Sequence, residues 1–501
     1  MTSPRPLPPS KADLRLPHDP SHRLELARRA LAGCGQDHVL QFVDRLDDAG
    51  RDRLLHQIET VDWKLVAELI ESHVRRQPRV RAPKRLEPAP IYPHPPQGPL
   101  VAQYARARAA GDELIRKGAV AVFTVAGGQG TRLGWDGPKG TFPATPIRRL
   151  PLFGCLAEQI LKVRRKYAAE IPWYIMTSPV NDEATRVFLR GQEYFGLDPA
   201  QVMIFPQGMM PAFDKATARV LLEAPDRLAL SPNGHGGALR SIADSGALDD
   251  MKKRGIDHIS YTQVDNPNVT AVDPLFIGLH ALDGCEMSSK AVAKTDPDER
   301  VGVFCLADGK VTVIEYSDMD EIPGRPGHER LEDGTLRFHA GSIAIHVIRC
   351  DFVRRLCATE RFALEFHRAE KKVPYLDPAT GHLVQPKKNN AVKLEMFVFD
   401  ALPLCKRSIV YETDRIDQFA PIKNADAPRP DDSVDSPRTS RNIQIERAAR
   451  WLEARGVKLP RDGRGRVDAT LEISALTAVE QDDLKAVTLP ESIDAGEQLL
   501  L

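Results

Sequence analysis

The sequence predicts an α/β protein whose body is a wound, mixed but mainly parallel β-sheet, with a helical N-terminal extension and a small C-terminal β element. Three observations support this prediction. Residues 21–76 carry apolar side chains three and four positions apart, as amphipathic helices do. From residue 119, short apolar or β-branched runs alternate with helical stretches, which is typical of a parallel sheet wrapped by helices. After residue 286, strand-like runs dominate and indicate an antiparallel extension of the same sheet.

The N-terminal part, residues 1–98, is expected to be a helical extension followed by a connector. The helical spacing is clear in "HRLELARRALAGCG" and "LLHQIETVDWKLVAELIESHV". Residues 77–99 are rich in proline, which donates no backbone hydrogen bond, so this stretch should run extended over a surface.

The body is expected to span residues 99–425, with strands such as "AVAVFTVA", "WYIMTS" and "GSIAIHVI". The C-terminal part, 426–501, should begin with a polar, proline-interrupted loop over 426–441, followed by a helix over "NIQIERAARWLEARG". The last forty or so residues should form a small separate element.

Charge and cysteine content exclude several classes of function. The 69 basic residues balance the 69 acidic ones, so no global field collects nucleic acid or an anionic membrane surface. The seven cysteines are scattered, without a C-x-x-C pair, which argues against a disulfide framework and a zinc site. The N-terminus lacks a signal-like apolar stretch and no later run reaches membrane-spanning length. A cytoplasmic protein is expected, with a monomer slightly favoured.

A glycine-rich loop, "VAGGQGTRLGWDGPKG" (125–140), follows the first apolar run of the body. A dinucleotide-binding loop requires G-x-G-x-x-G, and here Leu133 occupies the place of the third glycine. A Walker-type loop requires a lysine after its last glycine, whereas Gly134 is followed by Trp135. Neither of the common nucleotide-binding patterns fits.

The loop nevertheless has the composition of a polyanion site. The strand is expected to end at Ala126, and glycines at 127, 128 and 130 let backbone amide groups approach a phosphate closely. Arg132 and Lys139 add two positive charges. The alternative interpretation is a glycine-rich turn with two solvated charges.

Nine blocks of sequence carry a resemblance to a known family. The run G-G-x-G-T-R-L followed by P-K is similar to the signature loop of the sugar-1-phosphate nucleotidyltransferases. Further blocks lie in the family's order between about 100 and 426: "WYIMTS", "FPQGMMPA", "SPNGHGGALRSI", "VDNPNVTAVDPLFIG", "VIEYSD", "FHAGSIAIH", "EMFVFD" and "FAPIKNAD". The chain thus resembles the UDP-sugar pyrophosphorylase family, and within it the eukaryotic-type UDP-N-acetylglucosamine pyrophosphorylases.

The resemblance implies a Rossmann-like nucleotidyltransferase fold and the reversible formation of a UDP-sugar and pyrophosphate from UTP and a sugar 1-phosphate, with Mg²⁺ as cofactor. A sugar phosphate oxygen would attack the α-phosphorus directly, so positioning and positive charge would supply most of the catalysis. Direct displacement requires no side-chain nucleophile, in agreement with the lack of a compelling Ser-His-Asp or Cys-His signature.

The resemblance also implies roles for individual residues. Arg132, Lys139 and Lys423 would neutralise the phosphates, and Asp265, which follows an apolar strand, would bind the metal. The expected contacts to the sugar are His235, Glu315 and Ser342, and those to the nucleotide are Ala126, Gly127, Gly128, Gly130, Thr131, Gln207 and Gly234.

Two of these positions depart from the acetylglucosamine pattern. His235 and Ser342 stand where those enzymes typically carry asparagine, and a G-H-G run is similar to UDP-glucose and broad UDP-sugar pyrophosphorylases. Histidine can donate or accept a hydrogen bond and can be charged near neutrality. N-acetylglucosamine 1-phosphate is the first choice of sugar, and glucose 1-phosphate is the alternative.

Two rival hypotheses come from other classes of function. A non-catalytic UDP-sugar sensor would keep the pocket without turnover. The intact cations count against it, because a sensor could lose charges that stabilise only the transition state. A dinucleotide-dependent oxidoreductase would need the third glycine that Leu133 replaces.

Overall fold

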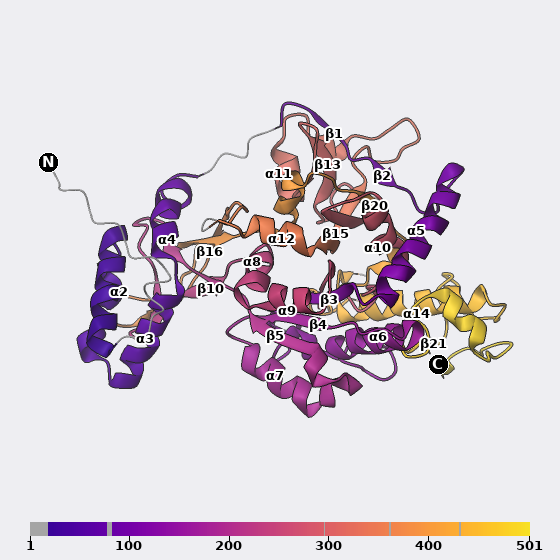
Figure 1. The fold of residues 1–501 in the computed structure, drawn as a ribbon, viewed down its shortest axis with the longest axis horizontal. Helices are drawn as coiled ribbons and strands as arrows, with labels where there is room; N and C mark the ends of the chain where they lie inside the picture. Colours follow the sequence, from indigo (N-terminus) through magenta and orange to yellow (C-terminus); the bar gives the residue numbers. More distant parts are fainter. Residues whose placement is uncertain (1–18, 78–82, 295, 360–361, 430–431) are drawn as a thin grey trace. The chain divides into compact units, whose positions relative to one another are not determined.

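The computed structural model describes residues 19–77, 83–294, 296–359, 362–429 and 432–501 (Figure 1). It divides into two compact units. The smaller unit comprises Met1–Arg81, Gln207–Ala238 and Thr359–Val398, and the larger unit comprises Ala82–Pro206, Leu239–Ala358 and Phe399–Leu501. The division into three consecutive domains, 1–98, 99–425 and 426–501, stays a prediction.

The smaller unit contains the expected N-terminal helices, α2 (Pro20–Cys34), α3 (Asp48–Thr60) and α4 (Trp63–Leu69). Each begins after an aspartate whose side chain accepts hydrogen bonds from backbone amides of the first turn, namely Asp19, Asp47 and Asp62. Their apolar faces are buried in one cluster with residues from 210–228 and 376–394. The helices therefore cover β structure that lies far from them in sequence.

The β structure of the smaller unit is built from short strands. A three-stranded sheet has the order β16 (His367–Lys371), β19 (Ala391–Glu395) and β7 (Phe213–Asp214). Three two-stranded pairs join β6 (Met209–Pro211) to β10 (Leu230–Pro232), β8 (Leu222–Ala224) to β9 (Arg227–Leu228), and β17 (Tyr375–Leu376) to β18 (Leu383–Val384).

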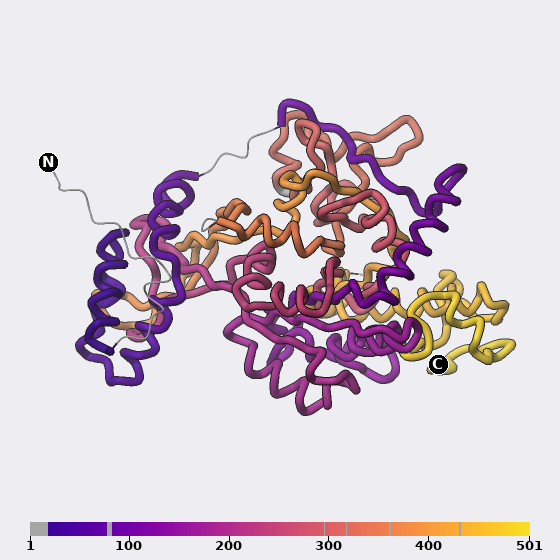
Figure 2. Tube along the Cα trace, viewed as in Figure 1, coloured from indigo at the N-terminus to yellow at the C-terminus, as the bar shows by residue number. Residues whose placement is uncertain are grey.

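The larger unit is organised by an 11-stranded sheet, whose main path is β2-β20-β12-β15-β11-β3-β4-β5. Its first half is parallel, as predicted: β3 (Val120–Val125) pairs in parallel with both β4 (Trp173–Thr177) and β11 (His258–Gln263), and β4 pairs in parallel with β5 (Val202–Pro206). The chain path through these strands can be followed in Figure 2. Parallel strands place their carboxyl ends at one edge of the sheet, where α/β proteins bind ligands.

The second half of the sheet is largely antiparallel. β15 (Ala340–Arg349) runs antiparallel to β11 and to β12 (Met287–Ala293), and β13 (Val303–Ala307) and β14 (Lys310–Ile314) form a hairpin beside it. β20 (Val410–Glu412) joins in parallel to β12. The prediction of a wound, mixed and mainly parallel sheet with an antiparallel extension is confirmed.

Part of the predicted connector joins the sheet as edge strands. β1 (Leu86–Pro88) pairs with β13, and β2 (Ile91–Tyr92) pairs with β20. Extended backbone rich in proline can pair along one side only, so it belongs at a sheet edge. The expectation of an extended surface segment did not include this pairing.

Helices α5 (Pro99–Arg116) and α10 (Pro274–Leu282) pack backbone to backbone. A Cβ atom at Gly111 would lie 1.8 Å from the carbonyl oxygen of Pro274, and one at Gly278 would lie 1.7 Å from that of Ala107. Only glycine fits either position. The other helices are α6 (Leu152–Tyr167), α7 (Asp182–Gly191), α8 (Gly237–Asp244), α9 (Ala247–Lys253), α11 (Tyr316–Glu321), α12 (Cys350–Leu356) and α13 (Arg415–Gln418). In the described ranges, no helix is long and apolar enough to cross a membrane.

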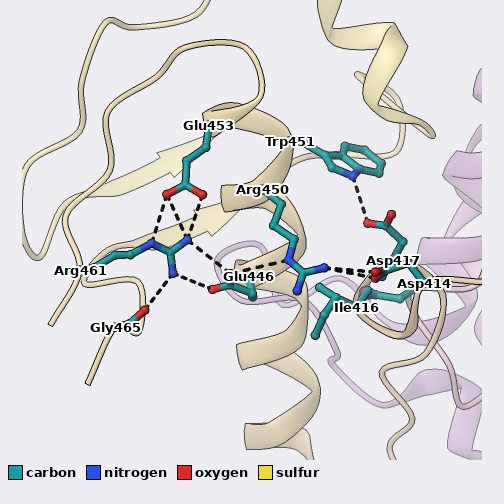
Figure 3. Close-up of polar contacts among 10 residues, drawn as sticks. Asp414, Ile416, Asp417, Glu446, Arg450, Trp451, Glu453, Arg461 and Gly465 are labelled. Carbon is teal, nitrogen blue, oxygen red and sulfur yellow. Dashed lines mark hydrogen bonds and ion pairs between the residues drawn. The ribbon is translucent and has the colours of Figure 1, made fainter. Parts of the chain in front are cut away.

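The C-terminal helix α14 spans Pro437–Glu453 and so begins inside the stretch predicted as a loop over 426–441. Proline is favoured at the first helical position, and Ser436 and Thr439 form a capping box, which together start the helix early. Figure 3 shows α14 held by polar contacts: Arg461 pairs with Glu446 and Glu453, and Arg450 pairs with Asp414.

The C-terminal element is anchored by two glutamates. β21 (Thr470–Glu472) pairs in parallel with β22 (Gln498–Leu500). Glu472 accepts hydrogen bonds from the backbone amides of Ile147 and Arg148 at 2.7 and 2.9 Å. Glu480 accepts two hydrogen bonds of 2.8 Å from Arg108 and also pairs with Lys166. Burial alone would raise the pKa of Glu480, but the hydrogen bonds from these two cations outweigh it and lower the pKa to about 2.

We predict that Glu480→Gln lowers the free energy of unfolding at pH 7 by on the order of 1 kcal/mol or more, because Arg108 and Lys166 each lose one of two carboxylate partners. A carboxylate with a lowered pKa stabilises the fold above its ordinary value of 4.5, and this contribution disappears as the pH falls towards about 2. Melting curves between pH 7 and pH 3 should show the difference from the wild type shrinking. The exposed Glu491→Gln is the control, and equal melting of the two variants at pH 7 would contradict the prediction.

Candidate active site

The glycine loop leaves β3 and folds back on itself at the carboxyl edge of the sheet. The amide of Gly130 donates to the carbonyl of Gly137 at 2.9 Å, and the amide of Lys139 donates to that of Gly128 at 3.0 Å. A Cβ atom at Gly130 would lie 2.7 Å from the side chain of Trp135, so only glycine fits there. Among the described residues, the amides of Gly127 and Gly128 donate to no protein acceptor. They remain able to bind an anion.

A buried amide, Asn181, fixes the loop from behind. Its Nδ2 donates to the carbonyl oxygens of Ala126 and Gly128 at 3.0 and 3.1 Å. These bonds turn two carbonyl groups towards Asn181. Sequence reasoning missed this residue, because it lies 55 and 53 positions after the two residues that it bonds and carries no motif of its own.

Two predicted cations and the predicted metal ligand converge. Lys139 Nζ lies 2.9 Å from Asp265 Oδ2, and both side chains are mostly buried. The amide of Ile422 donates to the carbonyl of Asp265 at 2.8 Å, which brings the neighbouring Lys423 to the same place. Burial raises the pKa of Asp265, but the charges of Lys139 and Lys423 outweigh it and hold the pKa below its usual value. Asp265 is therefore an anion between two cations.

The third predicted cation, Arg132, is exposed, and its main chain contacts the segment that carries Lys423. Its carbonyl accepts a hydrogen bond of 3.1 Å from the amide of Ala425, two residues after Lys423. The neighbouring Thr131 is also exposed. The glycine loop and the segment that carries Lys423 are thus joined through the main chain.

A pocket with about 400 Å³ of empty space opens beside Asp265 and Lys423. It brings in a third predicted residue, Ser342 of β15, whose amide donates to the carbonyl of Gly302 at 2.8 Å. Its wall is completed by Gln263, Asn266, Val269, Ile343, Ala344, Ile345 and Phe419. The lining thus combines polar side chains with apolar ones, as in sites for small molecules.

Glu315, predicted as a sugar contact, directly follows β14, which ends at Ile314, and occupies the position before α11. Among the described residues that line the pocket, Glu315 is absent. Its Oε1 lies 3.2 Å from the Cβ position of Gly302, the residue bonded to Ser342. A contact between Glu315 and a sugar stays a prediction.

The remaining predicted residues, Gln207, Gly234 and His235, belong to the smaller unit. Gln207 is buried. Gly234 has a φ of +86°, and a Cβ atom there would lie 2.3 Å from the carbonyl oxygen of Met396. The backbone amide of Val398 donates to His235 Nδ1 at 3.2 Å. Because Nδ1 accepts this bond, the ring proton of the neutral histidine lies on Nε2.

A buried network of amides, which sequence reasoning missed, joins the segment after Asp265 to the segment before Lys423. Asn266 Nδ2 donates to the carbonyl of Gln418 at 2.7 Å, and its Oδ1 accepts from the amide of Ala420 at 3.0 Å. Gln418 Oε1 accepts 2.8 Å from Nζ of Lys290, a fully buried lysine that also pairs with Asp273 at 2.6 Å. The "VDN" block placed Asn266 beside the metal ligand, but nothing in the sequence links it to Gln418.

A wound sheet whose carboxyl edge carries a glycine loop with two amides that donate to no described residue, and a cation-flanked carboxylate, is the arrangement expected of a nucleotidyltransferase. The family model described as UTP–glucose-1-phosphate uridylyltransferase matches residues 91–427, and the chain belongs to this family. The predictions of the UDP-sugar pyrophosphorylase family and of an enzyme of the uridylyltransferase class are confirmed.

Relatives extend the similarity over most of the chain. A UDP-N-acetylhexosamine pyrophosphorylase-like protein 1 of Xenopus tropicalis is 36% identical over 450 residues, which cover 86% of this chain and 85% of that protein. The UDP-N-acetylglucosamine pyrophosphorylase of Saccharomyces cerevisiae is 38% identical over 359 residues, covering 70% and 73%. The crystal structure of the uridine diphosphate N-acetylglucosamine pyrophosphorylase of Trypanosoma brucei, in complex with an inhibitor, matches with a TM-score of 0.78 at 26% identity, covering 96% and 98%.

We predict that Asn266→Asp, which keeps the shape of the side chain but loses the donor to Gln418, lowers kcat by about tenfold or more through misplacement of Asp265 and Lys423. The matched control is Gln36→Glu. Gln36 is also a buried amide, and it bridges Ala218 and Val220 of the smaller unit with bonds of 3.3 and 2.8 Å. Steady-state kinetics and melting curves should show lost stability in both variants and lost turnover only in Asn266→Asp. Equal kcat values in the two variants would contradict this prediction and show that Asn266 has a structural role only.

Proposed function

We propose that the protein transfers UMP from UTP to a sugar 1-phosphate, most readily N-acetylglucosamine 1-phosphate, forming a UDP-sugar and pyrophosphate. The observation that carries the proposal is the convergence of Lys139, Asp265 and Lys423 at the carboxyl edge of the sheet, next to the glycine loop. The named relatives that share most of the chain support the choice of sugar.

In the proposed reaction, an oxygen of the sugar phosphate attacks the α-phosphorus of UTP, and the bond from that phosphorus to the bridging oxygen of the β-phosphate breaks. Negative charge grows on the non-bridging and departing oxygens. Lys139, Lys423 and Arg132 would bind those oxygens, and the amides of Gly127 and Gly128 would hold the triphosphate in line. Because the attacking oxygen already carries charge, no protein group has to remove a proton from it.

Asp265 is a single carboxylate that could hold Mg²⁺ together with substrate phosphates. No group of three or more His, Cys, Asp or Glu side chains within the described part of the chain is arranged to hold a metal. Mg²⁺ is commonly bound by one or two carboxylates together with substrate phosphates, rather than by an all-protein cage. A single ionised carboxylate fits that mode, so Asp265 would hold Mg²⁺ together with the triphosphate. The ion, when bound, supplies positive charge to the phosphate oxygens.

The choice between the two sugars rests on His235. The amide of Val398 donates to its Nδ1, which places the ring proton of the neutral histidine on Nε2. An asparagine at this position would offer a donor and an acceptor. The named relatives favour N-acetylglucosamine 1-phosphate, and His235, through its resemblance to the histidine of the UDP-glucose enzymes, keeps glucose 1-phosphate as the alternative.

We also propose a cytoplasmic enzyme that acts as a monomer. The free state of all seven cysteines supports a reducing compartment.

The carboxylate and both lysines of the site are present, which argues against the sensor hypothesis, because binding alone would not require all three.

The first test is pyrophosphate release from UTP and Mg²⁺ with N-acetylglucosamine 1-phosphate and glucose 1-phosphate in parallel. We expect kcat/KM to favour the acetylated sugar by about tenfold or more, and His235→Asn to increase the preference. The control is His382→Asn, an exposed histidine of the smaller unit. A preference for glucose would replace the proposed sugar, and binding of UDP-sugar without pyrophosphate release would favour the sensor.

Removing charge from the site tests the mechanism. We expect Lys139→Ala and Arg132→Ala each to lower turnover by about two orders of magnitude or more, as loss of phosphate stabilisation should. Asp265→Ala should abolish the response to Mg²⁺. The control is Lys215→Ala, which removes a lysine that pairs with Glu370 at 2.6 Å in the smaller unit. Near-normal rates in folded variants, or an unchanged dependence on Mg²⁺, would overturn these roles.

A further inference from the structure

Three arginines come together at the start of α14. Arg438 and Arg441 lie in its first turns, and Arg149 lies in the loop before α6. Nη1 of Arg438 and Nη1 of Arg441 are shielded from solvent and have no acceptor in the described part of the chain. Buried donors are nearly always bonded, so two such nitrogens in one place point to an acceptor that the protein itself does not supply.

The charges of this arginine cluster (Arg149, Arg438 and Arg441) are not balanced. Burial lowers the pKa of Arg441, and the like charges of Arg149 and Arg438 lower it further. Asp426 opposes them, and its Oδ1 accepts a 2.8 Å bond from the backbone amide of Arg438. At Arg441, the charges of two neighbouring guanidinium groups therefore act against that of one carboxylate.

Two further features separate this cluster from an ordinary helix start. Two backbone amides in the first turn of α14 already donate to side chains, that of Arg438 to Asp426 and that of Thr439 to Ser436 Oγ. The arginine side chains, and not the helix end, would therefore bind an anion. Arg149 has a φ of 56°, in the left-handed region that non-glycine residues rarely occupy. Such strained residues concentrate where ligands are held.

The cluster is tied through the main chain to the proposed phosphate cations. Ala425, next to Asp426, donates its amide to the carbonyl of Arg132 at 3.1 Å. Lys423 donates its amide to the carbonyl of Asp435 at 2.6 Å, and its Nζ lies 3.2 Å from Asp435 Oδ2. The start of α14 and the phosphate-binding residues therefore form one connected piece of structure.

We propose that Arg149, Arg438 and Arg441 bind the terminal phosphates of UTP and the departing pyrophosphate. The proposal rests on the proposed function and names a further phosphate subsite within it. Arginine suits this role because its planar fork matches two phosphate oxygens at once. The arginine cluster would thus extend the phosphate contacts proposed for the glycine loop and Lys139 to the far end of the part of UTP that leaves.

The test is binding to the full chain without a sugar phosphate, so that no turnover occurs. Affinities for UTP, UMP and pyrophosphate are measured by titration calorimetry for the wild type, Arg441→Gln, Arg438→Gln and the control Arg450→Gln. Arg450 is an exposed arginine of the same helix, paired with Asp414. We expect both cluster variants to bind UTP and pyrophosphate about tenfold or more weakly and UMP unchanged. The control should bind all three as the wild type does.

Two outcomes overturn the proposal. Unchanged affinity for pyrophosphate in both cluster variants would remove the arginines from the phosphate site. An equal loss for UMP would show that the substitutions disturb the fold and not a subsite, and melting curves would register that damage independently. If the wild type released no pyrophosphate with any sugar phosphate, while the cluster variants still lost affinity for pyrophosphate, the proposed function would fail and the subsite would stand.

Discussion

The ionised carboxylate of Asp265 is the constraint on which the rest of the site depends. A carboxylate taken largely out of water keeps its charge only where positive charge is held against it. Lys139 and Lys423 supply that charge from segments that lie far from Asp265 in the sequence. The loop after β3, the turn after β11 and the segment after β20 must therefore come to one edge of the sheet together.

Hydrogen-bonded polar side chains determine how these three segments come together. Asn181 holds the glycine loop, and Asn266 with Gln418 holds the two segments that carry Asp265 and Lys423. Each of these side chains makes hydrogen bonds whose direction is fixed, and apolar packing alone does not impose such a direction. Lys290, buried beside the network, adds a positive charge that pairs with Asp273 and donates to Gln418. The arrangement is rigid where phosphates would have to be held in line.

Local patterns were enough to predict the sheet and the glycine loop, because the period of apolar residues and the positions of glycine act over short distances. Pairings across long distances could not be predicted in this way. The bond between Asn266 and Gln418 spans 152 residues, and no spacing rule connects them. The start of α14 at Pro437 was within reach of the sequence, since Ser436 and Thr439 form a recognisable cap. The polar composition of residues 426–441 outweighed that signal.

The state of the cysteines has a practical consequence for spectroscopy. Burial raises the pKa of six of the seven thiols, those of Cys155, Cys285, Cys305, Cys350, Cys357 and Cys405. Thiols that stay protonated at neutral pH react slowly with maleimides and similar reagents. A cysteine introduced at an exposed position such as Val180, which is 67% exposed, would outcompete them for label. Fluorophores or spin labels could then be attached at chosen places without first removing these six cysteines, which leaves Cys34 as the one native thiol to replace.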